Sequence, residues 1–318
     1  MDSFLTLKEM DMAKITAALV KELRDKTSAG MMDCKKALSE TDGDLEAAAD
    51  WLRTKGIAKA DKKADRVAAE GLVAVAIDGT TGALVEVNSE TDFVARNDGF
   101  QGAVAEISQL ALSVDNYEAL KAANTKAGLS VGDYLTKLVG TIGENMSLRQ
   151  MAKLSVSEGV VTGYMHNAVT DGMGKIGVIV ALESGGDTDA LNALGKKIAM
   201  HVAATNPLAL GVDDLDPAIV TKERDMLSAE ARESGKPEAI IEKMVDGRMS
   251  KFFKESVLMT QIFVMDGERS IEQVVADEAK SLGSDIKLTG YVRMELGAGI
   301  EKVEEDFAAE VAKTAAGA

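Results

Sequence analysis

The chain has little of what disulfide frameworks, metal centres and membrane spans require. Its 318 residues include one cysteine, Cys34, and two histidines, His166 and His201. A single cysteine excludes an internal disulfide framework and is typical of a reducing compartment. One cysteine and two histidines also leave few ligands for a transition metal, and no run approaches the ~20 apolar residues that span a bilayer. We therefore expect a cytoplasmic protein that has no cofactor and does not bind membranes.

Aromatic residues are also scarce, and basic residues are outnumbered. Aromatics make up 4% of the chain, so Ala, Leu, Val and Met must fill the core. The 52 acidic and 36 basic residues give a net charge of -16, which opposes attraction to phosphate backbones and anionic membranes. Direct binding of nucleic acid is therefore not expected. Residues 1–11 contain three acidic side chains and resemble neither a secretory signal nor a transit peptide, so they are either a tag or an upstream extension before Met12.

Residues 13–64 are predicted to form three short helices in an N-terminal domain. Apolar stripes at helical spacing mark them. The stripes are Ile15, Leu19 and Leu23, then Met31, Cys34, Ala37 and Leu38, then Leu45, Ala48, Ala49 and Leu52. A unit of this size usually presents a surface. Cys34 is favoured as a core residue over a nucleophile, and the basic stretch 55–66 is interpreted as a helical linker with a solvated face.

Residues 65–150 are predicted to form an antiparallel sheet with helices on one face. The apolar runs 71–77 and 83–87 flank Asp78-Gly79, which is a strong hairpin signal. Helices are expected to follow from Phe100, around Tyr117 and from Val131. This order of elements predicts an α+β fold.

Residues 151–298 repeat this plan. The run 159–166 corresponds to 71–78, 175–182 corresponds to 83–87, and a helix over 189–204 corresponds to the one from Phe100. In this copy the hairpin turn 167–174 is expected to be elongated. The two units are expected to stack as related subdomains.

A helical hairpin is predicted as an insertion into the second unit at about residues 216–254. Asp216-Pro217 begins its first helix, and 234–237 turns the chain. Such a hairpin is typical of a device for binding a partner or for forming a homodimer. Residues 257–265 and 289–296 are predicted strands of the second sheet, and 299–318 are predicted to form a C-terminal module containing a helix.

The loop over residues 88–100, which reads NSETDFVARNDGF, is the most informative segment. It lies between a predicted strand and a predicted helix and is therefore expected on the surface. Phe93 stands there beside Asp92 without an obvious core. Two interpretations stay open, because Phe93 is either a contact residue or a lid folded back on the following helix.

A search for catalytic motifs finds no convincing site. Residues 172–177 match GxGxxG, but a strand follows where the dinucleotide motif requires a helix N-terminus. No phosphate-binding GxxxxGK[ST] or HExxH motif occurs. His166 is favoured as a structural or solvated histidine over a general base, and His201 as a packing or surface residue. The residues by themselves indicate an acidic, multi-lobed interaction protein.

Five separated segments resemble bacterial elongation factor Ts. They are residues 14–38, the loop 86–100 with its TDFV sequence, 197–207, 234–248 and 299–311. The resemblance covers residues 12–312 in the family's order. It implies an N-terminal module like a ubiquitin-associated domain over 13–64, two core subdomains over 65–150 and 151–298, and a C-terminal module over 299–318.

The resemblance implies a non-enzymatic exchange factor that binds the translational GTPase elongation factor Tu. The family's magnesium-dislocating loop maps onto Thr91, Asp92, Phe93 and Val94. The family's other partner contacts map onto Arg24, Met31 and Met32 in the N-terminal module, His166 in the second subdomain, and the C-terminal helix. Two rival functions stay open: a binding or assembly module that does not accelerate nucleotide release, and a cysteine enzyme that uses Cys34.

Overall fold

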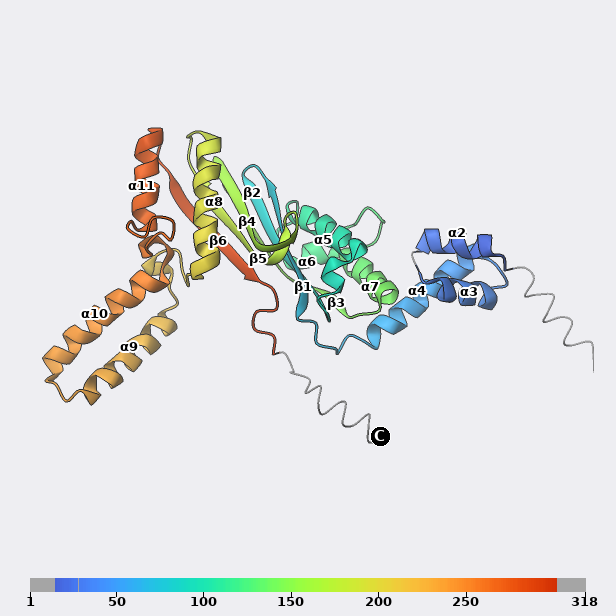
Figure 1. Cartoon of the computed structure of the whole chain (residues 1–318), viewed down its shortest axis with the longest axis horizontal. Helices are drawn as coiled ribbons and strands as arrows, with labels where there is room; N and C mark the ends of the chain where they lie inside the picture. The colour runs from blue at the N-terminus through green and yellow to red at the C-terminus, as the bar shows by residue number, and fades with distance from the viewer. Residues whose placement is uncertain (1–14, 28, 302–318) are drawn as a thin grey trace, which may run out of the picture.

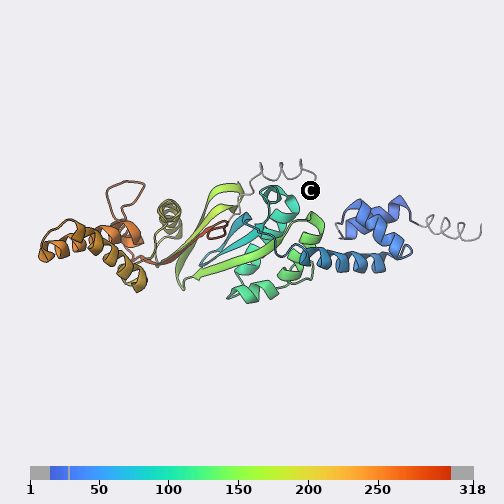
Figure 2. The ribbon, with the colours of Figure 1, turned by 90° about the horizontal axis from the view of Figure 1, so that it is seen from below.

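The computed structural model describes residues 15–27 and 29–301. The molecule is elongated, with three helices at one end, a sheet flanked by helices in the centre, and the hairpin of α9 and α10 at the other end (Figure 1). Figure 2 shows the same order of parts from below. The predictions for residues 1–11 and for the C-terminal helix lie outside the described residues.

Three helices form the N-terminal module, as the sequence predicts. They are α2 (Ala17–Thr27), α3 (Met31–Glu40) and α4 (Leu45–Asp61). Leu23, Cys34 and Leu38 are fully buried between them. Met31 differs from the prediction, because it lies outside this core and is exposed. Helix α4 continues to Asp61 and therefore includes much of the basic stretch that is interpreted as a helical linker.

Helix α4 joins the module to the centre by crossing α7 (Val131–Ile142). Gly56 and Gly140 meet at the crossing, where a Cβ atom on Gly140 would lie 2.9 Å from the Cα of Gly56. The two backbones can approach this closely because neither residue has a side chain. A larger residue at position 140 would therefore push the two helices apart.

The central part contains two units with the same strand plan. The first consists of β1 (Glu70–Asp78), β2 (Thr81–Ser89), η1 (Val94–Arg96), α5 (Asp98–Ala111), α6 (Tyr117–Ala122), α7 and β3 (Met146–Ser155). The second consists of β4 (Gly159–Thr170), β5 (Met173–Glu183), α8 (Thr188–Thr205), η2 (Val212–Asp214), α9 (Pro217–Glu233), α10 (Glu238–Ser256), η3 (Leu258–Thr260), α11 (Ile271–Leu282) and β6 (Lys287–Glu295). Each middle strand, β2 or β5, pairs antiparallel with the other two strands of its unit.

Two glycines at equivalent positions support the internal repeat. Gly71 and Gly159 begin the first hairpin of each unit with φ values of 117° and 124°. A Cβ atom would lie 2.2 Å from the carbonyl oxygen of Val87 at Gly71, and 2.1 Å from that of Leu182 at Gly159. Both positions thus exclude a side chain, because each has a positive φ and neither has space for a Cβ atom.

The two units pack through opposite faces of their strands. Helices α5 to α7 cover one face of the first unit around Phe100, and α8 and α11 cover one face of the second around Ile198. Val73 and Leu84 of the first unit share a further core with Ile179 of the second. A short β1–β5 pairing also joins all six strands into one sheet. The structure confirms the α+β class, whereas the domain boundaries stay predictions.

Two further predictions of local structure are wrong. The turn 167–174 is not elongated, because β4 and β5 continue through most of it and only Asp171 and Gly172 separate them. Residues 257–265 do not form a strand of the sheet but contain η3 and two isolated bridges. Strand β3 and helix α11 were not predicted at all.

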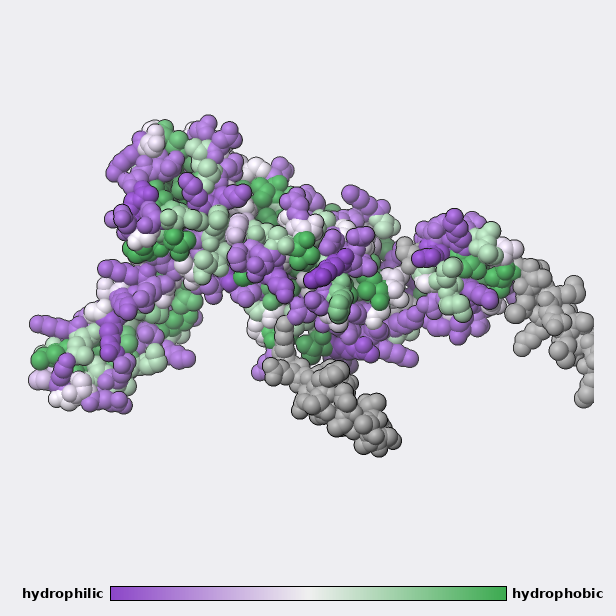
Figure 3. Space-filling model, viewed as in Figure 1, coloured by the Kyte–Doolittle hydropathy of each residue, from purple (hydrophilic) through white to green (hydrophobic). Residues whose placement is uncertain are grey.

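Polar side chains cover much of the visible surface, with apolar residues scattered over the module and the hairpin (Figure 3). Within the hairpin, Leu227, Ile241 and Val245 form a separate small core. The hairpin is therefore stabilised largely by its own contacts.

Candidate functional site

The loop between β2 and α5 presents Phe93 to solvent. Its side chain is 77% exposed, and Asp92 beside it is exposed as well. The alternative in which Phe93 folds back over α5 is therefore wrong. A large ring that is this exposed is unusual on a soluble protein and is typical of a contact residue.

The loop is anchored on the C-terminal side of Phe93. Val94 and Ala95 are buried against the core of the first unit. The side chain of Gln101 donates a hydrogen bond of 2.8 Å from Nε2 to the carbonyl oxygen of Ala95, and Asn97 caps α5 by accepting from the Phe100 amide at 3.1 Å. Val94 thus belongs to the support of the loop and not to its exposed tip.

The loop is also anchored on the N-terminal side. Glu144, in the turn between α7 and β3, accepts hydrogen bonds from the Thr91 amide at 2.9 Å and from the Thr91 hydroxyl at 2.7 Å. Ser89 donates from Oγ to the carbonyl oxygen of Thr91 at 3.0 Å. Sequence reasoning missed Glu144, since it lies 53 residues from Thr91 and no motif connects them.

The other predicted contact residues lie on different elements. Met31 and Met32 begin α3 and are 58% and 76% exposed, and Arg24 is exposed on α2. His166 is exposed on β4, and its Nδ1 atom lies 3.2 Å from the hydroxyl of Tyr164. The structure thus places all of them on the surface but does not gather them in one cavity.

The remaining candidate chemical groups are placed as structural residues. Cys34 is fully buried, and burial raises the pKa of its thiol, which disfavours the reactive thiolate. Burial also lowers the pKa of His201, although its hydrogen bond to Gln261 opposes this shift. The Nε2 atom of His201 lies 2.9 Å from Oε1 of Gln261, and Nδ1 lies 3.3 Å from the Val264 amide.

Within residues 15–27 and 29–301, no group of three or more His, Cys, Asp or Glu side chains is arranged to hold a metal ion. In the same part of the chain, no helix combines the length and apolar character that crossing a bilayer requires.

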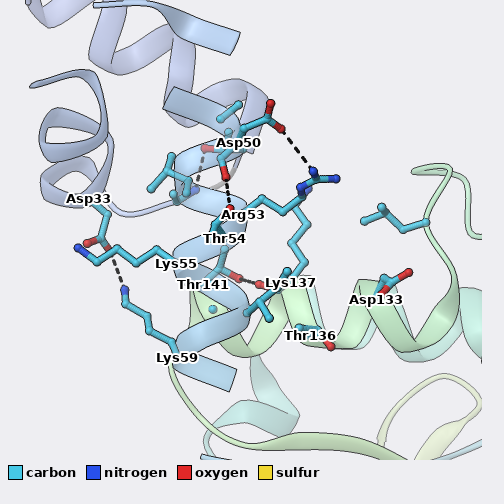
Figure 4. A pocket seen from close by; sticks show the side chains of 18 of the residues that line it. Asp33, Asp50, Arg53, Thr54, Lys55, Lys59, Asp133, Thr136, Lys137 and Thr141 are labelled. Carbon is cyan, nitrogen blue, oxygen red and sulfur yellow. Dashed lines mark hydrogen bonds and ion pairs between the residues drawn. The ribbon is translucent and has the colours of Figure 1, made fainter. Parts of the chain in front are cut away.

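A cleft of about 510 Å³ lies beside the crossing of α4 and α7. Figure 4 shows its charged lining, in which Lys59 contacts Asp33 at 3.1 Å and Arg53 contacts Asp50 at 3.6 Å. Lys55 also lies over the ring of Trp51. The cleft contains charges of both signs, partly paired, and it includes none of the predicted contact residues.

Comparison with known proteins gives one consistent result. The family model described as Elongation factor TS matches residues 90–298, which is more than half of the chain. The chain belongs to the elongation factor Ts family. The match includes Thr91, Phe93 and Glu144, so the exposed ring and the attachment of Thr91 to the turn lie within the matched residues.

Curated members of the elongation factor Ts family extend the similarity over nearly the whole chain. The protein of Sphingopyxis alaskensis is 60% identical over 306 residues, which cover 96% of this chain and 99% of the relative. That of Rhodospirillum centenum is 58% identical over 96% of this chain and all of the relative. That of Rhizobium meliloti is 56% identical over 95% of this chain and 99% of the relative. All three are named Elongation factor Ts, so the chain is a translation elongation factor by family.

Proposed function

We propose that this member of the family is a guanine-nucleotide exchange factor for elongation factor Tu in the cytoplasm, and that it performs no covalent chemistry of its own. The observation that carries the proposal is the exposed ring of Phe93 on a loop anchored at both ends. A rigid exposed ring can enter a neighbouring protein with little loss of conformational entropy.

The expected mechanism follows from how GTPases hold nucleotide. Backbone amides, a lysine and Mg²⁺ bind the phosphates, and the ion is the largest local charge in such a site. A ring inserted among the groups that position the ion would stabilise the open, nucleotide-poor state. Asp92 would add a negative charge beside the same site. Because coupling is reciprocal, nucleotide that rebinds must weaken the factor's own binding and release it.

Further contacts would secure the complex away from the loop. We assign this role to Arg24, Met31 and Met32 on the module and to His166 on β4, all of which are exposed. The C-terminal helix expected from the sequence would contribute as well. Self-association through α9 and α10 stays a prediction, and the exposed Met226 and Ile240 of the hairpin are where it would be tested.

The decisive experiment is stopped-flow release of a fluorescent GDP from elongation factor Tu at increasing concentrations of this protein. The wild type should accelerate release strongly. Phe93→Ala should lower the maximal rate by about 10-fold or more and leave the affinity for GDP-bound GTPase within about 3-fold, because the ring acts mainly on the open state. With Mg²⁺ removed by a chelator, the difference between the two proteins should largely disappear.

Val67→Ala serves as the control, since Val67 is also an exposed apolar residue but lies outside the loop. It should behave as the wild type. If well-folded wild-type protein bound the GTPase without accelerating release, the chain would be a binding module and the proposal would be wrong. If Phe93→Ala lost binding and exchange to the same extent, the ring would be a general contact and not a wedge.

A further inference from the structure

The turn that holds the Phe93 loop is built from three residues, Gly143 to Asn145, between α7 and β3. Gly143 ends α7 in the left-handed conformation, with φ at 91° and ψ at 12°. This conformation reverses the chain within one residue. As a result, Glu144 emerges from the turn beside Thr91 and not along the axis of α7.

The contacts between turn and loop are reciprocal. Each oxygen of the Glu144 carboxylate accepts one hydrogen bond from Thr91. In return, the carboxylate of Glu90 accepts a hydrogen bond from the amide of Asn145 at 2.5 Å and from Nη1 of Arg66 at 3.3 Å. Two successive loop residues are therefore fixed to two successive turn residues, and charge assistance strengthens each bond.

These attachments restrict the part of the loop that presents Phe93. Thr91 is fixed by Glu144, and Val94 is fixed by burial. Asp92 and Phe93 are the two residues between these anchors, and both are exposed. With so short a span, the direction of the Phe93 ring depends on where Thr91 is held.

We infer that Glu144 is a positioning residue for nucleotide exchange: it acts through Thr91 to present Phe93 in the orientation that the GTPase accepts. The inference rests on the proposed exchange function. Glu144 need not touch the GTPase for this role. Its removal therefore affects how fast nucleotide leaves the complex and not how tightly the complex forms.

A carboxylate suits this role because both Thr91 groups are donors. Leucine at position 144 keeps much of the volume but removes both acceptors. Glutamine keeps one acceptor for the amide, and its NH₂ group can donate to the threonine hydroxyl, which also accepts. Glu144→Gln is therefore a conservative variant that should retain much of the attachment. Thr91→Val and Thr91→Ser form the corresponding pair on the loop.

The test is the same stopped-flow titration, from which the maximal release rate and the half-saturating concentration are obtained separately. Glu144→Leu should lower the maximal rate by about 10-fold, because small displacements of a reacting or wedging group are costly. Its half-saturating concentration should stay within about 2-fold of the wild type. Glu144→Gln and Thr91→Ser should recover most of the rate.

A double-mutant cycle tests whether the two residues act as a unit. Thr91→Val should cost less than Glu144→Leu, because it removes the hydroxyl bond but keeps the bond from the Thr91 amide. The double variant should cost little more than Glu144→Leu alone. Glu183→Leu is the matched control, since Glu183 is also half-buried and ends the strand before the equivalent connection in the second unit. Its maximal rate should be that of the wild type.

Three results would overturn the inference. They are an unchanged maximal rate for folded Glu144→Leu, additive losses in the cycle, and a change confined to the half-saturating concentration, which would make Glu144 a binding contact. Circular dichroism and the thermal midpoint establish that each variant is folded. Failure of the proposed function itself is recognised separately, because then the wild type would not accelerate release.

Discussion

The two units of the core use the same connection for different purposes. In each, the middle strand leads through a connection into a helix with an acidic or amide N-cap, Asn97 for α5 and Asp187 for α8. The first connection, residues 90–97, contains the exposed Phe93, whereas the second, residues 184–187, contains Ser184, two glycines and the cap. The shared architecture thus provides the scaffold, and one lengthened connection provides the candidate functional site.

Replacing the first connection by the second should have the largest effect. Replacing residues 90–97 by the four-residue sequence of 184–187 should preserve the sheet and abolish exchange, because the ring and its anchors are lost. The maximal rate of GDP release should fall to that of elongation factor Tu alone. Circular dichroism should still show mixed helix and strand. Substantial exchange by a folded graft would show that the activity lies elsewhere in the molecule.

The equivalent glycines test whether the two units require the same backbone conformation. Gly71→Ala and Gly159→Ala should each lower the free energy of unfolding by at least about 2 kcal/mol, because both require positive φ and both Cβ atoms would meet a carbonyl oxygen. Denaturant titration measures this. Gly102→Ala in α5 and Gly247→Ala in α10 are controls with open space, and each should stabilise its helix by about 0.5–1 kcal/mol. Unequal effects of the first two variants would argue against a true structural repeat.

Protonation of a buried histidine in the second unit should change stability by less than the glycine substitutions do. Fourteen residues after the N-cap, α5 has Ala111 and α8 has His201, and both are buried. Burial lowers the pKa of His201 in the folded state. The unfolded chain therefore binds a proton first as pH falls below about 6.5, and the folded state loses stability by at most about 1.4 kcal/mol per pH unit.

Stability measured between pH 7 and 5 checks this prediction. His201→Gln should be less stable at pH 7, because the hydrogen bonds to Gln261 and Val264 change. Its stability should also depend less on pH than that of the wild type. An equal pH dependence in both proteins would assign the effect to other groups.

Local patterns were enough to predict the elements that later carry the candidate site. Asp78-Gly79 indicated the first hairpin, and the polar loop after it indicated a surface segment with Phe93. Helix α11 also had a local signal, the capping box of Ser270 and Gln273, and could have been predicted from it. The resemblance to the family added the identity of the loop.

Long-range contacts were beyond reach from the sequence alone. Strand β3 pairs with β2 although more than 50 residues separate them, and its polar centre at Arg149 and Gln150 hides the alternation of a strand. Those side chains are held instead by the buried carboxylate of Glu86. The attachment of Thr91 to Glu144 is of the same kind. Such partners become visible only when the fold brings them together.

Because α4 contacts α7 at Gly56 and Gly140, a small change of angle at this crossing, like the tilt of a lever at its fulcrum, moves the distant end of α4. Eleven residues separate Gly56 from the start of the helix at Leu45, which corresponds to about 16 Å at 1.5 Å per residue. A tilt of about 5° at the fulcrum would move that end by about 1.4 Å, and the surface of Met31 and Met32 would move with it. The two glycines therefore determine how precisely the N-terminal module is oriented relative to Phe93.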